Sequence, residues 1–316
     1  MIAAFAGLGP HFAAVERCMA AALVSEELRV EHLIADLGPF HGKLLRPALV
    51  LLVAETLGQV GAAHHTLGAA LEMIHTATLI HDDLIDDSDQ RRGAPSAHVR
   101  FGNTTAVLLG DYFYTHAFAI VAALDDPELM RRLTRVTNVI CAGELHQQMA
   151  ARDASVTEAE YDRIIYAKTA CLTELAGVFG ATGANDAQRA AAAAFGRSCG
   201  MAFQIADDCL DVAGDAAKVG KTLATDIERG RMTLPVIRWL AQGEAPAKAA
   251  HLLAATTPER VLAVRAEITA SGAVASALAT ARHHVSVATA ALAGLPPGQA
   301  RDRLAELAAF IVSRDH

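Results

Sequence analysis

Two short aspartate-rich segments carry the residues most able to do chemistry in this chain. One reads DDLID at 82–86, and the other reads DDCLD at 207–211, with the same spacing. On a helix, the first and last aspartates of each segment lie one turn apart on the same face, where like charges repel. A hard divalent cation offsets that repulsion. Both segments are therefore predicted metal-binding clusters; their carboxylates are Asp82, Asp83 and Asp86 in the first and Asp207, Asp208 and Asp211 in the second.

Each aspartate cluster ends a largely apolar stretch, 69–80 before the first and 200–206 before the second. An acidic helix end can simply be a solvated surface. An apolar helix that must be buried places its terminal carboxylates at the mouth of an interior instead. Two clusters of the same form, each in this setting, favour a functional site.

Basic residues accompany both clusters. GKLLRP at 42–47 supplies Lys43 and Arg46, the first cluster is followed by Arg91 and Arg92, and the second is followed by Lys221 and Arg231. Mg²⁺ is usually bound through one or two carboxylates together with substrate phosphates, and Lys and Arg groups bind phosphate oxygens. The combination predicts a diphosphate site, although each basic residue taken alone would be a solvated surface charge.

The elements that position these clusters are predicted to be helices. Apolar residues recur at helical spacing, and alternating strand-like runs are nearly absent. Thr157 with Glu160 forms a capping-box pattern, and Asn103 and Asn185 are predicted N-caps. Loops are expected at 88–102 and 214–231. We predict an all-α protein with one domain over 1–316, and helices at 11–36, 44–58, 62–87, 103–124, 127–153, 158–180, 186–213, 232–242, 258–270, 273–293 and 298–313.

Composition and charge exclude several classes of protein. The chain has 316 residues, 53% of them hydrophobic, and a formal net charge of −8, which excludes a disordered chain and argues against nucleic-acid binding. Its 5 cysteines are widely spaced and indicate neither a disulfide framework nor a zinc site. The strongly apolar run 48–54 is much shorter than the roughly 20 residues that span a membrane. The expected compartment is the cytoplasm, and no transmembrane segment is expected.

The sequence resembles the trans-isoprenyl diphosphate synthases, the polyprenyl synthetase family, over nearly its whole length. Five collinear segments carry the resemblance. In that family an antiparallel helical bundle, the isoprenoid synthase fold, surrounds a central cavity with both DDxxD motifs at its mouth. The matching segments are GKLLRP at 42–47, EMIHTATLIHDDLIDDSDQRRG at 72–93, KTA at 168–170, FQIADDCLD at 203–211 and GKTLATDIERGRMTLP at 220–235.

The resemblance implies a role for each matching residue. Both aspartate clusters, Lys168 and Lys221 would be catalytic, with several Mg²⁺ ions held by Asp82, Asp86 and Asp207. The isopentenyl diphosphate site would comprise Lys43, Arg46, His75 and Arg92, and the allylic diphosphate site would comprise Arg91, Lys168, Thr169, Gln204, Lys221 and Arg231. The chain departs from the family pattern where Arg231 replaces a lysine, where Ala224 replaces a glycine, and where no basic residue follows Lys43.

The implied reaction is head-to-tail condensation. The allylic diphosphate ionises, the isopentenyl double bond attacks the carbocation, and the released diphosphate takes the proton. The alternatives are a class I terpene cyclase, a metal phosphohydrolase that uses His81 and Asp82, and a non-catalytic partner subunit. A cyclase needs no isopentenyl site, a phosphohydrolase leaves the second cluster unused, and a partner subunit would have lost aspartates.

Product length and assembly follow from the same resemblance. In the family, aromatic residues four or five positions before the first cluster stop growth at fifteen carbons. Here Thr78 and Ala77 occupy those positions, and Ile74 lies one turn further back. We therefore expect a medium- or long-chain all-trans polyprenyl diphosphate, with geranylgeranyl or farnesyl diphosphate as the alternatives. The resemblance also implies a homodimer, and the sequence permits one, because 103–124 and 127–153 carry apolar residues on more than one side.

Overall fold

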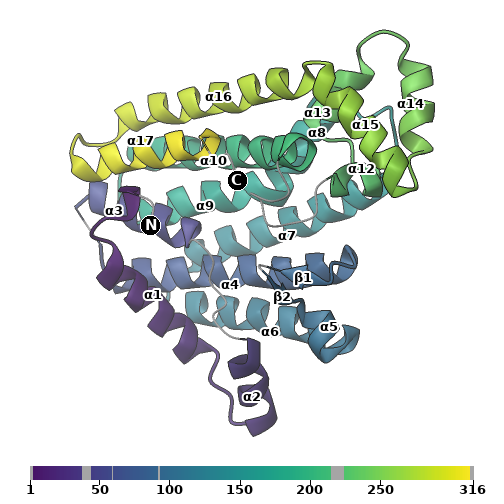
Figure 1. The fold of residues 1–316 in the computed structure, drawn as a ribbon. Coiled ribbons are helices and arrows are strands. Elements are labelled where there is room, and N and C mark those ends of the chain that lie inside the picture. Colours follow the sequence, from purple (N-terminus) through teal and green to yellow (C-terminus); the bar gives the residue numbers. More distant parts are fainter. Residues whose placement is uncertain (1–2, 38–43, 59, 92, 215–223, 314–316) are drawn as a thin grey trace. The chain divides into compact units, whose positions relative to one another are not determined.

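The computed structural model describes residues 3–37, 44–58, 60–91, 93–214 and 224–313 (Figure 1). Nearly all regular structure in these ranges is helical, with one antiparallel pair of two-residue strands. The prediction of an all-α protein is confirmed. The chain divides into two compact units: unit 1 comprises 1–137, 175–193 and 294–304, and unit 2 comprises 138–174, 194–293 and 305–316. The single-domain assignment stays a prediction.

Unit 1 is built around one long buried helix, α4. Its residues Leu67, Leu71 and Ile74 recur at helical spacing and are fully buried. Helix α4 packs against α1, α3 and α6, and Figure 1 shows α6 running alongside it. The elements wholly within unit 1 are η1 (Ala3–Phe5), α1 (Gly9–Ala22), α2 (Leu28–Leu37), α3 (Leu45–Thr56), α4 (Ala62–Ile85), β1 (Gln90–Arg91), β2 (Ala94–Pro95), α5 (Ala97–Phe101) and α6 (Asn103–Ala122).

Unit 2 has its own hydrophobic core. Trp239 is buried in it, and Lys248 lies over the indole ring with its Nζ 5.2 Å from the ring centroid. Helices α13 and α16 pack side by side (Figure 1). The elements wholly within unit 2 are α8 (Glu158–Ile165), the π-helical turn η2 (Tyr166–Ala170), α12 (Thr225–Arg229), α13 (Leu234–Leu240), α14 (Ala245–Leu253), α15 (Pro258–Ala270) and α16 (Ala273–Ala291). Segments of both units contribute to α7 (Pro127–Met149), α9 (Cys171–Gly180), α10 (Asp186–Ala213), η3 (Leu292–Gly294) and α17 (Gln299–Val312).

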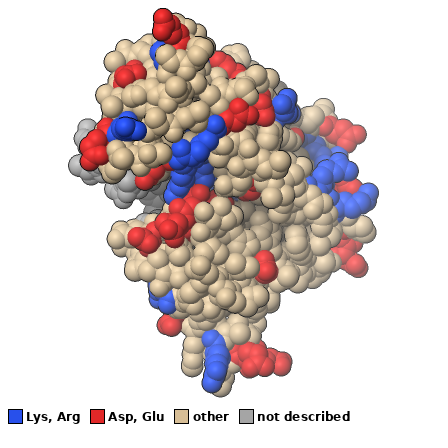
Figure 2. Space-filling view, turned by 90° about the vertical axis from the view of Figure 1, so that its right-hand side faces the viewer, with Lys and Arg blue, Asp and Glu red and all other residues tan. Residues whose placement is uncertain are grey.

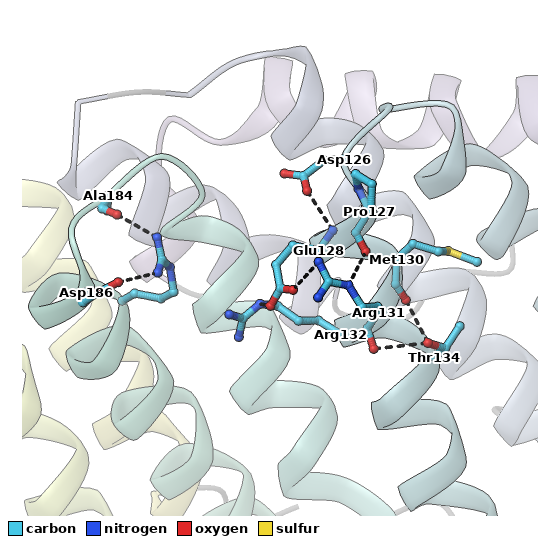
Figure 3. A network of polar contacts seen from close by, with 10 residues as sticks. Asp126, Pro127, Glu128, Met130, Arg131, Arg132, Thr134, Ala184 and Asp186 are labelled. Carbon is cyan, nitrogen blue, oxygen red and sulfur yellow. Dashed lines mark hydrogen bonds and ion pairs between the residues drawn. The ribbon is translucent and has the colours of Figure 1, made fainter.

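Charged side chains gather in small groups of mixed sign on the face drawn in Figure 2. A network of charged and polar groups also lies at the start of α7 in unit 1 (Figure 3). There the Asp126 carboxylate accepts a hydrogen bond from the Glu128 backbone amide at 2.9 Å, and Glu128 pairs with Arg131 and Arg132 at 3.0 and 2.8 Å. Nearby, Arg189 pairs with Asp186 at the start of α10. These pairs stabilise helix starts, where negative side chains interact favourably with the helix dipole.

Two predicted N-caps are confirmed and one is wrong. Thr157 Oγ1 accepts from the Glu160 amide at 3.2 Å, and Asn185 Oδ1 accepts from the Gln188 amide at 2.9 Å. Asn103 is instead the first residue of α6, because Gly102 with φ +83° takes the N-cap position. A positive φ is far less costly for glycine than for asparagine.

Some predicted boundaries are also wrong. The helix expected over 11–36 is two helices, α1 and α2, because Ser25 Oγ accepts from the Glu27 amide at 3.1 Å and so favours a turn. The expected loop 88–102 contains β1, β2 and α5. The described end of the second expected loop contains α12, and α14 was missed altogether.

Helix α6 is long and apolar enough to cross a membrane by length and composition alone, with one third of its most apolar window buried. Its Val107 and Leu108 are 42% and 62% exposed, whereas Phe113 is fully buried. One face of α6 thus packs in unit 1, and another presents apolar side chains at its surface.

Candidate active site

The first aspartate cluster lies at the end of α4. His75, Thr78, Asp82 and Asp86 follow one another at intervals of three or four residues, and all four are half-buried. Asp86 is the C-cap residue of the helix. Unit 1 therefore has one face of α4 that carries the two predicted metal ligands together with a predicted isopentenyl-site histidine and a predicted chain-length residue.

The middle aspartate of this cluster is engaged elsewhere. Asp83 is 4% exposed, and both of its carboxylate oxygens accept hydrogen bonds from Nε of Arg91, at 2.8 and 2.7 Å. Arg91 sits in β1, whose pairing with β2 fixes the backbone that carries the guanidinium group. A charge-assisted contact of this kind anchors Arg91 beside the cluster. Its predicted contact with the allylic diphosphate stays a prediction.

His81, which precedes the cluster, packs on α6. Its Nε2 lies 3.0 Å from the carbonyl oxygen of Val107 and 3.7 Å from the carboxylate of Asp111. Gly110 provides the space, because a Cβ there would lie 2.1 Å from His81 Nε2. The phosphohydrolase alternative needed this imidazole beside Asp82 as a metal ligand, and the ring is instead used in helix packing.

The three predicted chain-length residues differ in exposure. Ile74 and Ala77 are fully buried, whereas Thr78 is half-buried and its hydroxyl donates to the His75 carbonyl at 2.8 Å. Thr78 is therefore the member of this set that lies on the same face of α4 as Asp82.

The second cluster, on α10 in unit 2, holds its middle carboxylate in a dense polar network. Asp208 is 6% exposed, and its Oδ2 accepts from the Tyr161 hydroxyl at 2.7 Å. Its Oδ1 accepts from Gln204 Nε2 at 2.8 Å, and Gln204 Oε1 in turn accepts from the Thr169 hydroxyl at 2.7 Å. The network joins two predicted allylic-site residues, Thr169 and Gln204, to the aspartate cluster.

The last aspartate of the cluster organises the neighbouring helix. Asp211 is 5% exposed, and its carboxylate accepts from the backbone amides of Thr225 and Asp226 at 3.3 and 3.0 Å and from the Thr225 hydroxyl at 3.0 Å. These donors are the start of α12. Asp211 thus caps α12, and Asp207 is the half-buried carboxylate of the cluster.

The pKa values of Asp208 and Asp211 are raised because these carboxyl groups are buried close to other carboxylates. Burial, followed by the nearby charge of Asp226, raises the pKa of Asp211 to about 6 and raises the pKa of Asp208 well above its ordinary value. A divalent cation near Asp207 would offset this accumulation of negative charge, so the donor set fits Mg²⁺. Among the described residues, no group of three or more His, Cys, Asp or Glu side chains is arranged to hold a metal ion by itself.

Lys168 and Thr169 lie in the π-helical turn η2. The ammonium group of Lys168 lies 2.6 Å from the carboxylate of Glu144 on α7. A π turn adds one residue to a helical turn and is frequent at functional sites. Both predicted allylic-site residues of the KTA segment are thus placed in the same unit as the second cluster.

Two departures from the family pattern have a structural setting. Arg231 pairs with Asp226 at 3.2 Å, and Asp226 in turn donates its amide to Asp211. Ala224 has φ +62°, the left-handed region that favours glycine, and its amide donates to the Asp211 carbonyl at 2.8 Å. The alanine therefore keeps a backbone conformation that glycine adopts without strain.

Three predicted basic residues, Lys43, Arg92 and Lys221, lie outside the described residues. Arg46 is half-buried in the first turn of α3. The structure adds Tyr161 and Asp226 to the surroundings of the second cluster. The GKTLATDIERG segment contains Asp226 and could have indicated it, whereas no local pattern distinguishes Tyr161.

Comparison with known proteins gives a consistent result. The model of the family described as polyprenyl synthetase matches residues 29–268. The octaprenyl diphosphate synthase of Haemophilus influenzae is 37% identical over 281 residues, covering 87% of this chain and 85% of that protein.

Solved structures agree with the sequence comparison. A decaprenyl diphosphate synthase from Rhodobacter capsulatus superposes with a TM-score of 0.92 at 34% identity, covering 99% of this chain and 98% of that one. A polyprenyl synthase from Caulobacter crescentus CB15, complexed with calcium and isoprenyl diphosphate, gives a TM-score of 0.93 at 34% identity, covering 99% and 97%. The predicted isoprenoid synthase fold is confirmed.

Proposed function

Since the chain belongs to the polyprenyl synthetase family and is therefore a trans-prenyltransferase, we propose that it makes an all-trans polyprenyl diphosphate longer than fifteen carbons. The substrates would be isopentenyl diphosphate and an allylic diphosphate, condensed head to tail. The observation that carries the proposal is the pair of DDxxD clusters, each at the end of an apolar helix segment and each with half-buried carboxylates.

We propose that Asp82 and Asp86 in unit 1 and Asp207 in unit 2 hold Mg²⁺, with several ions per active site. The half-buried state of these three carboxylates supports the assignment, as does the raised pKa of Asp211 beside Asp207. Bound Mg²⁺ would supply Lewis-acid stabilisation of the negative charge on the leaving diphosphate.

Separate sets of residues would bind the two substrates. Lys168, Thr169 and Gln204 would bind and orient the allylic diphosphate, with Arg91, Lys221 and Arg231 adding positive charge. The isopentenyl diphosphate would be held by Lys43, Arg46, His75 and Arg92. Fixed cationic groups aimed at the departing diphosphate stabilise the charge that develops there, which is the main electrostatic contribution.

Side chains on α4 would set the length of the product. The octaprenyl and decaprenyl diphosphate synthases to which the chain is similar support a product longer than fifteen carbons. No Phe, Tyr or Trp occurs between Leu71 and Ile80, so a chain growing back along the Thr78 face meets none of these large rings on this helix. One turn of helix is about 5.4 Å, so each added turn lengthens the tunnel appreciably. Phe113 on the neighbouring α6 is a candidate for the end of the tunnel.

The decisive experiment is product analysis. The protein is incubated with Mg²⁺, isopentenyl diphosphate and farnesyl diphosphate, and the dephosphorylated products are separated by chromatography. The expected product is a linear polyprenol longer than fifteen carbons. A cyclic hydrocarbon, release of phosphate without elongation, or no turnover would each refute the proposal.

Variants of α4 locate the tunnel. Both Thr78→Phe and Ala77→Phe should shorten the product, because a ring then fills space occupied by a small side chain. Since Ala77 is fully buried, Ala77→Phe also tests tolerance to overpacking, which costs about 1–3 kcal/mol. Unchanged product length in a folded Thr78→Phe variant would show that the tunnel runs elsewhere.

We also propose a homodimer that covers α6. The exposure of Val107 and Leu108 supports this surface, because exposed apolar side chains grouped on one helix face often mark protein interfaces. Light scattering should give twice the 33.1 kDa chain mass at micromolar concentration. Leu108→Glu should shift the mass to that of one chain, whereas Leu262→Glu, on the 56% exposed Leu262 of α15, should not. A wild-type mass of one chain would refute the dimer.

A further inference from the structure

The ion pair between Lys168 and Glu144 is largely shielded from solvent. Lys168 Nζ lies 2.6 Å from Glu144 Oε1, and the two side chains are only 19% and 18% exposed. Charges shielded from water interact more strongly than surface charges, which are screened by solvent and salt. Glu144 lies outside the five segments that carry the family resemblance, so the pair joins a predicted substrate contact to a residue with no assigned role.

The backbone brings the two side chains together. Gly143 lies against η2, and a Cβ at this position would lie 2.5 Å from the Cβ of Ala167 and 3.3 Å from the Lys168 amide nitrogen. Only a residue without a side chain allows α7 to approach the π-helical turn this closely. The next residue, Glu144, thereby reaches the Lys168 ammonium group. Gln147 Nε2 donates to the second oxygen of Glu144 at 3.4 Å and helps orient the carboxylate.

The same turn points into the polar network of the second cluster. Thr169 follows Lys168 and donates its hydroxyl to Gln204, which donates to Asp208. A diphosphate bound by Lys168 and Thr169 would therefore place its oxygens close to the Glu144 carboxylate. Glu144 and the diphosphate would use the same ammonium group, and their negative charges would repel each other.

We propose that Glu144 is a built-in counter-anion of Lys168 that competes with the diphosphate. It holds the ammonium group in place between reactions, and it weakens the binding of inorganic pyrophosphate so that this product leaves. The inference rests on the proposed function, because it takes Lys168 as a contact of the allylic diphosphate. Glu144 is accordingly a positioning residue that acts through Lys168.

Calorimetric titration of the full chain with inorganic pyrophosphate in the presence of Mg²⁺ tests this directly. Glu144→Gln keeps the size and an oxygen acceptor for Lys168 but removes the charge. It should bind pyrophosphate about threefold or more tightly, since a nearby negative charge has been removed. The KM for the allylic diphosphate should fall in parallel, with the KM for isopentenyl diphosphate unchanged.

The matched control is Glu160→Gln. Glu160 is a carboxylate of the same unit that contacts a different basic side chain, His146, at 2.9 Å. Its substitution should leave pyrophosphate affinity at the wild-type value. Glu144→Asp, which keeps the charge, should also stay near wild type. Equal tightening in the Asp and Gln variants would overturn the charge argument.

A second variant, Gly143→Ala, tests the role of the close approach between α7 and η2. Gly143→Ala should tighten pyrophosphate binding in the same direction as Glu144→Gln, because it pushes α7 away from η2 and lengthens the ion pair. Unchanged or weaker binding in both variants, with their helical circular dichroism intact, would overturn the inference.

Wild-type protein and Lys168→Ala test the underlying function. If the wild type binds pyrophosphate and elongates prenyl chains, and Lys168→Ala weakens binding by about tenfold, the proposed function stands whatever Glu144 does. If the wild type neither binds pyrophosphate nor elongates, the proposed function itself fails.

Discussion

The two aspartate clusters share one sequence pattern but use their carboxylates differently. On α4, the first and third aspartates, Asp82 and Asp86, are half-buried on one face, and the middle one, Asp83, is buried and held by Arg91. On α10, the middle and third aspartates, Asp208 and Asp211, are both buried in hydrogen bonds, and Asp207 is half-buried.

Two segments with the same aspartate spacing can therefore have different structural environments. In the first cluster the third aspartate is a C-cap residue on the same face as the first, and these two carboxylates are the proposed cation ligands. In the second cluster the third aspartate accepts three hydrogen bonds from the start of α12 and organises that helix. The middle aspartate is buried and hydrogen-bonded in both clusters, to Arg91 in the first and to Tyr161 and Gln204 in the second.

The largest effect on turnover is expected from removing a proposed metal ligand in either cluster. Asp82→Ala or Asp207→Ala removes a proposed metal ligand and should lower kcat by about 10²-fold or more, the scale of losing one electrostatic contact to the transition state. Steady-state kinetics at saturating Mg²⁺, with circular dichroism to check the fold, measures it. Asp89→Ala, at an exposed aspartate just beyond the first cluster, is the control. Near-normal turnover in either variant would refute the metal assignment.

The basic residues near each cluster provide a substrate-specific test. Lys43→Ala should raise the KM for isopentenyl diphosphate, and Lys221→Ala should raise the KM for the allylic substrate. Each loses a charge-assisted contact worth about 1.5–3 kcal/mol. Two-substrate kinetics separates the effects. The same approach should group Arg92 with Lys43 and Arg91 with Lys221, and selectivity in the opposite sense would reverse the assignment.

The third aspartates sharpen the comparison. Asp211→Ala should lower the free energy of unfolding by about 1–3 kcal/mol, because the amides at the start of α12 lose their acceptor. Asp86→Ala should lower turnover with little change in stability. Urea unfolding of the two variants measures the contrast. Equal stability losses at both positions would mean that Asp86 is as structural as Asp211.

The smallest effect concerns the strained residue beside Asp211. Ala224→Gly should stabilise the protein by less than about 1 kcal/mol, since relief of the left-handed conformation is partly offset by the greater freedom of glycine in the unfolded chain. Thermal unfolding compared with Gly102→Ala, which introduces the opposite change at φ +83°, measures it. A lower midpoint for Ala224→Gly would show that the buried methyl group outweighs the backbone strain.

Local pattern was sufficient for much of the fold. Helical periodicity predicted α4, α7 and α10 to within a few residues, and the caps at Thr157 and Asn185 followed from residue type. It failed where a short side chain redirected the backbone, as at Ser25 between α1 and α2, and where glycine displaced asparagine at the start of α6. Alternative capping residues and turns differ in free energy by only a few tenths to about 1 kcal/mol, and residue type and spacing do not resolve differences of that size.

The sequence by itself determined the helical class, the two DDxxD patterns and the five segments that identify the family, because residue type and spacing are local properties. Tertiary structure decided how deeply each carboxylate is buried and which groups donate hydrogen bonds to Asp83, Asp208 and Asp211. Packing brings Tyr161 to Asp208 and Glu144 of α7 to Lys168, whereas Gln204 precedes Asp208 by one turn of α10 in the same segment. Burial and hydrogen bonding depend on distant segments of the chain, so one motif yields two environments: a half-buried pair on one face of α4, and a buried pair on α10 that accepts hydrogen bonds from Tyr161 and from the start of α12.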